Sequence, residues 1–367
     1  MAKAHSRHKE YSLILAAAVA ALLFFTGKAE SMGMLVLLNT AAIAAILWSA
    51  FSVVRHADVL AHRFGEPYGS LILSLSIVVL EVSLISILML SGSAGEHLMR
   101  DTVYAVIMIV MAGLVGFALL LGGWKYKTQN YNFTGINHFL ISILPLAVIV
   151  FVLSNAMPGG GFNGIQYAII AVLCLAMYGV FLHVQTKTHR QFFIYEAEDE
   201  DEDHHGKPSS HSSAWHAVFL IVHLVAVIGI TKLNAKPLEL FLLKLNMPAE
   251  FTGFLVALLI LTPEGLGAFS SILKNQVQRA MNLLLGSVIA TISLTVPVVV
   301  FIAAITGQSI STGLDLPTII VMATTLGVCQ TSLTSGLTTA PSGAAHIVLL
   351  VTYTLLMFRY TLLFSCL

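Results

Sequence analysis

The segment Leu258–Phe269 reads LLILTPEGLGAF and places one carboxylate, Glu264, inside an otherwise apolar run. The segment Ser74–Ile85, SLSIVVLEVSLI, does the same around Glu81. Insertion scales assign a charged side chain at the bilayer centre a cost of about 2.5 to 3.5 kcal/mol, so an intramembrane carboxylate is a functional candidate by default. These two glutamates are therefore the predicted centre of function.

Each of the two glutamates follows a short motif of the same kind. Glu66-Pro-Tyr-Gly69 begins 15 residues before Glu81, and Glu250-Phe-Thr-Gly253 begins 14 residues before Glu264. A match of this length is weak alone, but here the motif and the glutamate recur together. The pattern indicates an internal repeat.

The composition predicts a membrane protein. Of the 367 residues, 57% are hydrophobic and 10% are charged, whereas soluble domains carry about 25% charged residues. An ordinary soluble enzyme is thereby excluded. Crossing about 30 Å of hydrocarbon takes roughly 20 residues, and only helices satisfy their backbone alone in lipid. Eleven stretches qualify as helical spans: 11–27, 32–54, 69–91, 102–123, 136–155, 163–184, 215–231, 251–273, 280–305, 317–331 and 343–364.

One polar segment divides these spans. Glu196–His205 reads EAEDEDEDHH, and its mutually repelling charges predict a solvated linker. Six spans precede it and five follow. Without the first span, two sets of five remain, and an odd number gives the sets opposite orientations, as in inverted-repeat transporters. The expected organisation is a leading helix in 1–31, a five-helix repeat in 32–190, an acidic linker in 191–214 and a second repeat in 215–367.

The positive charges favour an orientation with the amino terminus and the acidic linker in the cytoplasm. That arrangement places twelve of the eighteen Lys and Arg residues inside, where the positive-inside rule expects them. A predicted loop carrying Lys232, Lys236 and Lys244 opposes it. The chain is formally neutral, so its charge gives no indication of a nucleic-acid partner.

Buried carboxylates suggest a mechanism. Desolvation favours the protonated form of a carboxyl group, and a bound cation restores the ionised form. Protons and metal ions then compete for the same oxygens. Such a site, open alternately to the two sides of the membrane, exchanges one for the other.

Oxygen ligands for a hard cation occur near the second glutamate. Pro263 has no N–H and leaves the Leu259 carbonyl without its helical partner. Thr262 adds a hydroxyl, and Ser287 and Thr291 lie four residues apart on one helical face. We expect Glu81 and Glu264 to bind the cation and proton, with Thr262, Ser287 and Thr291 as supporting ligands. For each hydroxyl, bonding to its own helix is an equally open alternative.

Other polar groups receive less specific interpretations. The cluster from Arg55-His-Ala-Asp58 to Glu66 is interpreted as a solvated, salt-bridged loop rather than a pH sensor. His183, His216, His223 and His346 are interpreted as interfacial groups near span ends. The sequence contains no HExxH, GxSxG or Walker A motif, so neither an enzyme nor a cofactor is predicted.

Three long stretches resemble the calcium/cation antiporter superfamily in its calcium/proton exchanger branch: Arg55–Ile85, the acidic linker, and Phe251–Val298. The resemblance implies eleven helices, two inverted repeats, a bacterial inner-membrane location and ion-binding glutamates at Glu81 and Glu264. It also matches the family's third repeat helix to Gly286-Ser287, with Thr291 at the place of a polar ligand. The Gly-Asn-Ala-x-Glu pattern typical of that branch is absent here, and its asparagine ligand is missing from both stretches.

These observations predict a secondary active antiporter that exports Na⁺ and K⁺ in exchange for protons, with Ca²⁺ as a further substrate left open. A dedicated Ca²⁺/proton exchanger is the first alternative. A cation channel and a non-transporting scaffold are the others. The predicted partners are inorganic cations, protons and lipid, and a second copy of the chain stays open.

Overall fold

The computed structural model describes residues 10–27, 30–64, 68–91, 95–157, 161–193 and 211–359. Across these residues the chain is helical, and its only β pairing is an isolated bridge between Asn130 and Leu337. Nine described helices are long and apolar enough to cross a membrane, and two shorter apolar helices accompany them. The predicted all-helical fold is confirmed, and these helices match the eleven predicted spans one for one.

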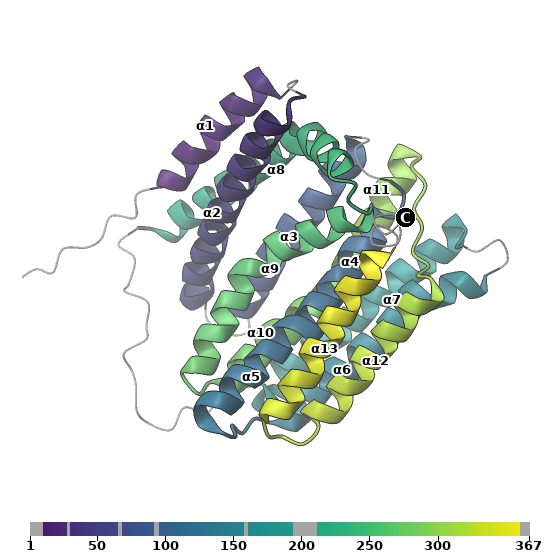
Figure 1. Cartoon of the computed structure of the whole chain (residues 1–367). Helices are drawn as coiled ribbons and strands as arrows, with labels where there is room; N and C mark the ends of the chain where they lie inside the picture. The colour runs from purple at the N-terminus through teal and green to yellow at the C-terminus, as the bar shows by residue number, and fades with distance from the viewer. Residues whose placement is uncertain are drawn as a thin grey trace, which may run out of the picture. The chain divides into compact units, whose positions relative to one another are not determined.

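The chain divides into two compact units, which are described separately. The first unit consists of residues 1–93 and 196–245. Its helices, labelled in Figure 1, are α1 (Tyr11–Thr26), α2 (Met32–Phe64), α3 (Tyr68–Leu90) and α8 (Ser213–Lys244).

The second unit consists of residues 94–195 and 246–367. Several of its rods are α-helices continued through π-helical or 3₁₀ turns. They are α4 (Leu98–Met108), η1 (Ile109–Leu114) and α5 (Val115–Tyr126); α6 (Phe133–Ala147), η2 (Val148–Val152) and η3 (Leu153–Ala156); α7 (Gly164–His183), η4 (Val184–Thr188) and η5 (Arg190–Phe192); α9 (Glu250–Leu273); α10 (Val277–Ala290), η7 (Thr291–Thr295) and α11 (Val296–Thr306); α12 (Leu316–Leu333); and α13 (Ala340–Met357).

Each compact unit contains helices from both sides of the acidic linker. The predicted division into two repeats concerns the order and orientation of the helices, which the two compact units do not test. The two repeats therefore stay a prediction. The acidic segment itself, Glu196–His205, lies outside the described residues.

In the first unit, buried amide groups join α2 to α8. Asn234 Nδ2 donates to Asn39 Oδ1 at 3.0 Å, and Asn39 Nδ2 donates to the Leu35 carbonyl at 2.8 Å and the Pro237 carbonyl at 3.2 Å. Interhelical bonds of this kind stabilise helix pairs in lipid. The bond from Asn39 also holds α8 to α2 at Pro237.

The predicted end of this span at Thr231 was therefore wrong. Helix α8 runs to Lys244, so Lys232, Lys236 and Lys244 are helical residues with exposed side chains rather than members of a loop. Lys244 Nζ donates to the backbone carbonyl of Glu30.

The predicted loop at Arg55–Arg63 is also wrong, because α2 continues to Phe64. No glycine or proline lies between Met34 and Phe64, and the unit buries His56 of this helix. His56 is fully buried, as are His216 and His223 on α8. The interfacial interpretation of His216 and His223 is corrected accordingly.

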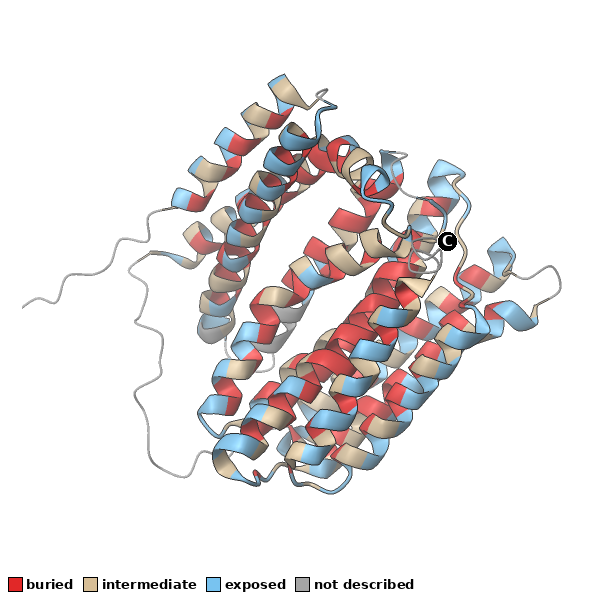
Figure 2. Ribbon diagram, viewed as in Figure 1, coloured by how far each residue is buried: buried red, intermediate tan, exposed pale blue. Residues whose placement is uncertain are grey.

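The second unit is organised around α4 and η1. Ten of the eleven α4 residues are buried, all but Arg100, and helix α4 appears almost wholly red in Figure 2. Helix α9 packs on it through Gly253, where an added Cβ would lie 2.7 Å from the Thr102 nitrogen. The glycine of the second repeat motif thus permits a backbone approach that a side chain would prevent.

The outer helices present apolar side chains. On α7, Ile165, Ile169 and Val172 are 75%, 55% and 64% exposed. Contiguous exposed apolar surface is typical of a membrane or protein interface, and on a helix of this length and composition it indicates lipid.

The close approach at Gly253 generates a stability prediction. We expect Gly253→Ala to lower the free energy of unfolding by about 1 to 3 kcal/mol, because the new Cβ overlaps backbone atoms that cannot rotate away. Gly229→Ala on α8 is the matched control. Nothing lies within 4 Å of its added Cβ, and alanine favours a helix by roughly 0.5 to 1 kcal/mol over glycine. Thermal unfolding in detergent measures both, and equal stabilities would contradict the packing.

Candidate functional site

Glu264 lies on α9 in the second unit and is 4% exposed. Pro263 precedes it within the helix, so the Leu259 carbonyl has no N–H donor at the usual position. The next residue, Gly265, brings α9 against η1, since its added Cβ would lie 2.9 Å from Leu114 Cδ2. The carboxylate is therefore on a helix that faces a π-helical segment.

Glu81 lies on α3 in the first unit and is 1% exposed. The neighbouring hydroxyls of Ser76 and Ser83 donate to carbonyls of their own helix, Ile72 at 2.7 Å and Val79 at 2.6 Å. Both predicted glutamates are thus buried within helices. They belong to different compact units, and each is described within its own.

The three predicted supporting ligands differ in their surroundings. Thr262 is half-buried and donates to the Leu258 carbonyl at 2.6 Å, and it lies two residues from Glu264, on nearly the opposite side of the helix. Ser287 donates to the Leu284 carbonyl at 2.9 Å. Thr291 is 3% exposed. The Thr262 and Ser287 oxygens keep lone pairs for a cation, so the ligand roles stay predictions, with the burial of Thr291 the most favourable.

Thr291 begins the π-helical segment η7, which sequence reasoning missed. Single π turns inside α-helices are frequent at functional sites. Within η7, the Ser293 hydroxyl is fully buried and has no hydrogen-bond partner in the described part of the chain. Pro297, two residues after η7, was the available signal, because a proline removes a backbone donor.

The segment η1 is the corresponding irregularity of the fourth span. His346 on α13 is fully buried, and its Nδ1 lies 2.6 Å from the Met111 carbonyl. A carbonyl only accepts, so Nδ1 carries the proton, and Nε2 accepts from the Ser332 hydroxyl at 2.8 Å. The interfacial interpretation of His346 was wrong, because this histidine satisfies a carbonyl inside the unit.

Gly116 in the fourth span lies close to α13. Its added Cβ would lie 2.8 Å from His346 Cβ, so the glycine accommodates α13 rather than an ion.

A third buried carboxylate was not predicted. Asp101 is 7% exposed in the first turn of α4, and Arg100 Nε donates to its Oδ1 at 2.8 Å. This ion pair neutralises it, and its position at the helix start distinguishes it from Glu264.

This chain is similar to known proteins in sequence and in fold. The family described as sodium/calcium exchanger protein matches residues 34–187 and 215–359, on either side of the acidic linker. The sodium-potassium/proton antiporter ChaA of Escherichia coli (strain K12) is 56% identical over 96% of this chain and 97% of its own length.

Two solved structures share the fold. The Ca²⁺/H⁺ antiporter protein YfkE superposes with a TM-score of 0.70 at 16% identity, over 96% of this chain and 100% of that one. The H⁺/Ca²⁺ exchanger CAX superposes with a TM-score of 0.64 at 13% identity, over 94% and 88%.

The bond from His346 to η1 generates a prediction. His346→Ala removes the imidazole donor of the buried Met111 carbonyl and leaves it only the weaker Cys329 Sγ donor at 3.7 Å, which costs about 1 to 3 kcal/mol of stability. We expect a lower unfolding temperature in detergent and faster amide exchange in η1. His183→Ala, at an exposed position on α7, should change neither, and an unaltered η1 in the His346 variant would contradict the assigned bond.

Proposed function

This chain belongs to the sodium/calcium exchanger protein family, and we propose that it is a secondary active antiporter that exchanges cations for protons across a bacterial inner membrane. The observation that carries the proposal is the burial of Glu81 and Glu264 in apolar helices. Their positions in two similar motifs support a shared role. The 56% identity to a protein named as a sodium-potassium/proton antiporter supports the substrate class.

Charge explains the coupling. An ionised carboxylate in a low-dielectric interior needs a neutralising partner. A proton and a metal ion both meet that need, and each excludes the other. Alternating exposure of the glutamates then returns protons in one direction for every cation moved in the other, with no nucleotide or cofactor.

Na⁺ and K⁺ are the proposed exported ions, and Ca²⁺ is the further candidate. All three are hard cations that take oxygen ligands. The proposed site offers two carboxylates, with Thr262, Ser287 and Thr291 hydroxyls in support. The absence of amide side chains beside either glutamate leaves fewer ligands than a Ca²⁺ site of high affinity uses.

The proposed organisation keeps residues 1–31 as a leading helix, 32–190 and 215–367 as inverted repeats, and 191–214 as a cytoplasmic linker. The amino terminus is proposed to be cytoplasmic as well. Lys232, Lys236 and Lys244 no longer form an opposing loop, since they lie on α8. Lipid is the surrounding partner, and a homo-oligomer is compatible with the exposed apolar helices.

The glutamates have a direct test. Inside-out vesicles containing Glu81→Gln or Glu264→Gln should show no proton movement when Na⁺, K⁺ or Ca²⁺ is added separately, because the glutamine amide does not ionise and so cannot take up and release the transported proton. Glu96→Gln, whose side chain is 50% exposed, is the matched control and should transport normally. Near-normal exchange in either buried variant would refute the site, and the ion that gives the largest response identifies the substrate.

We expect loss of the Thr291 hydroxyl to weaken cation binding rather than to abolish it. Thr291→Val keeps the shape and removes one oxygen ligand, so we expect the apparent cation affinity to fall about fivefold, the equivalent of roughly 1 kcal/mol. Thr352→Val on the exposed side of α13 should leave it unchanged. An unchanged affinity in the Thr291 variant would remove this residue from the site.

A further inference from the structure

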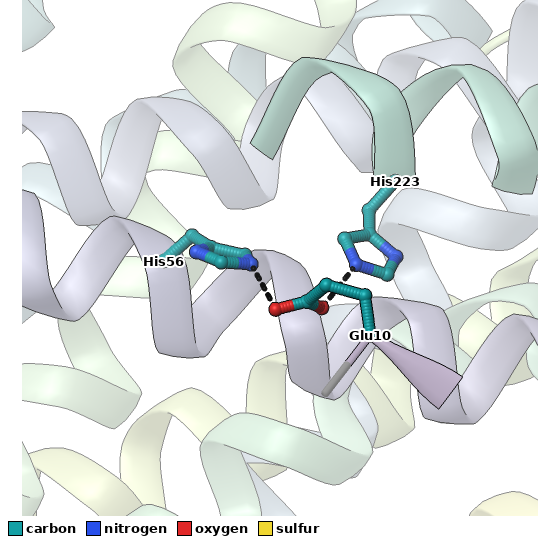
Figure 3. A group of neighbouring side chains, drawn as sticks. All are labelled: Glu10, His56 and His223. Carbon is teal, nitrogen blue, oxygen red and sulfur yellow. Dashed lines mark hydrogen bonds and ion pairs between the residues drawn. The ribbon is translucent and has the colours of Figure 1, made fainter. Parts of the chain in front are cut away.

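A second group of ligand-type side chains lies in the first compact unit, apart from the residues of the proposed transport site. Glu10, His56 and His223 each contribute one atom to a set whose members all lie within 4.8 Å of one another. His223 Nε2 is 3.0 Å from Glu10 Oε2, and His56 Nε2 is 3.5 Å from Glu10 Oε1. Figure 3 shows both imidazole rings directed at the carboxylate. The histidine side chains are fully buried and that of Glu10 is 10% exposed.

Three elements supply these residues. Glu10 immediately precedes α1, His56 lies on α2 and His223 lies on α8. The helices are neighbours elsewhere as well: Ser12 and Ser52 hydroxyls lie 3.0 Å apart across α1 and α2, and Asn39 and Asn234 join α2 to α8. Packing of the unit thus brings the three side chains together before any ligand is considered.

The hydrogen bonds define the protonation of His56. Arg55 Nη2 lies 3.3 Å from His56 Nε2, and a guanidinium only donates, so Nε2 presents a lone pair. The neutral ring then carries its proton on Nδ1, which donates to His216 Nδ1 at 2.9 Å. A metal-binding histidine has this arrangement, with one nitrogen free to ligate and the other N–H held by a neighbour.

His223 can present a lone pair as well. Its Nε2 donates to Glu10, and its buried Nδ1 has no partner among the described residues. Only the bond to Glu10 keeps the proton on Nε2, and a metal ion replaces that bond. The Glu10 Oε2 atom accepts from His223 Nε2 at 3.0 Å and from Arg55 Nη2 at 2.7 Å, so the carboxylate faces both donors.

We propose that Glu10, His56 and His223 form a binding site for one divalent transition-metal ion of the Zn²⁺ class. Two imidazoles and one carboxylate are a ligand set that Zn²⁺ uses, and Zn–N distances of 2.0 to 2.1 Å put tetrahedral ligand atoms about 3.4 Å apart. The 3.5 Å between His56 Nε2 and Glu10 Oε1 already matches that edge. The widest separation is at most 4.8 Å, so it needs to contract by no more than about 1.4 Å to meet the same value.

Arg55 is the competitor for this site. Its Nη2 lies 2.7 Å from Glu10 Oε2, and its side chain is 37% exposed. The guanidinium neutralises the carboxylate when no metal is bound, and its exposure lets it turn toward solvent when a metal binds. An ion held by all three ligands ties the start of α1 to α2 and α8.

Ligand chemistry separates this site from the transport site. Nitrogen ligands favour Zn²⁺, Co²⁺ and Ni²⁺, whereas Na⁺, K⁺ and Ca²⁺ prefer oxygen. The transported cations should therefore not displace the metal from the three residues.

The test is calorimetric titration of the purified, tag-free full-length chain with ZnCl₂ in excess Na⁺ and K⁺, with Co²⁺ absorption as a report of ligand geometry. We expect one Zn²⁺ per chain and a tetrahedral Co²⁺ spectrum. Glu10→Gln and His223→Ala should each remove this binding. His216→Ala, which removes the acceptor for His56 Nδ1, should weaken it about tenfold.

Arg55→Gln should change the Zn²⁺ affinity in the opposite direction. Loss of a partly exposed competing ion pair should tighten Zn²⁺ binding about two- to fivefold, a result that a merely structural cluster would not give. An affinity no tighter than that of the unaltered chain would contradict the competition. Cation-evoked proton movement after reconstitution of the same preparations into vesicles reports that the Glu10, His223, His216 and Arg55 variants are folded.

Two further variants identify the site that binds. His204→Ala with His205→Ala alters the histidines of the acidic linker and should leave Zn²⁺ binding unchanged; loss of binding there, with retention in His223→Ala, would overturn the proposal. Glu81→Gln with Glu264→Gln should abolish transport and keep Zn²⁺ binding. Loss of Zn²⁺ binding in that double variant would overturn the assignment of the Zn²⁺ site to Glu10, His56 and His223. Continued transport would overturn the proposed function instead.

Discussion

The account depends on one constraint: an ionised carboxylate cannot remain unneutralised in an apolar interior. Glu81 and Glu264 are 1% and 4% exposed on helices that are otherwise apolar. A proton or a cation meets the constraint, and Asp101 illustrates a third solution, a permanent partner in Arg100 at 2.8 Å. Arg100 is a permanent partner, whereas a proton or a cation can be exchanged, and that exchange is the basis of the proposed transport.

Departures from regular α-helix lie where the second unit needs polar groups. Pro263 precedes Glu264, Thr291 opens η7, and η1 presents the Met111 carbonyl to His346. In lipid such backbone is tolerated only where protein or water satisfies it. Irregular turns therefore supply oxygen atoms in a protein that has few polar side chains. The Glu10 cluster of the first unit is different, because nitrogen atoms dominate it and select a different class of metal.

Sequence reasoning predicted the membrane spans, which are long apolar runs, and the burial of Glu81 and Glu264, which are charges that interrupt such runs. Both predictions depend on local composition. It failed where tertiary packing decides. The polar residues after Val54 looked like a loop, yet α2 continues, and the buried His56 on it bonds to His216 on α8. The lysines after Thr231 looked like a loop, yet Asn39 and Asn234 hold α8 to α2 beyond that point. The π turns have no period of their own: Pro145 and Pro297 lie beside η2 and η7, but no proline lies near η1 or η4.

The most direct measurement of the central claim is proton release on cation binding to the purified protein in weakly buffered detergent solution. If protons and cations share the buried carboxylates, adding the transported cation must acidify the solution. The release must disappear when both Glu81 and Glu264 are replaced by glutamine. Cation binding without any proton release, or equal release from the double variant, would contradict the account.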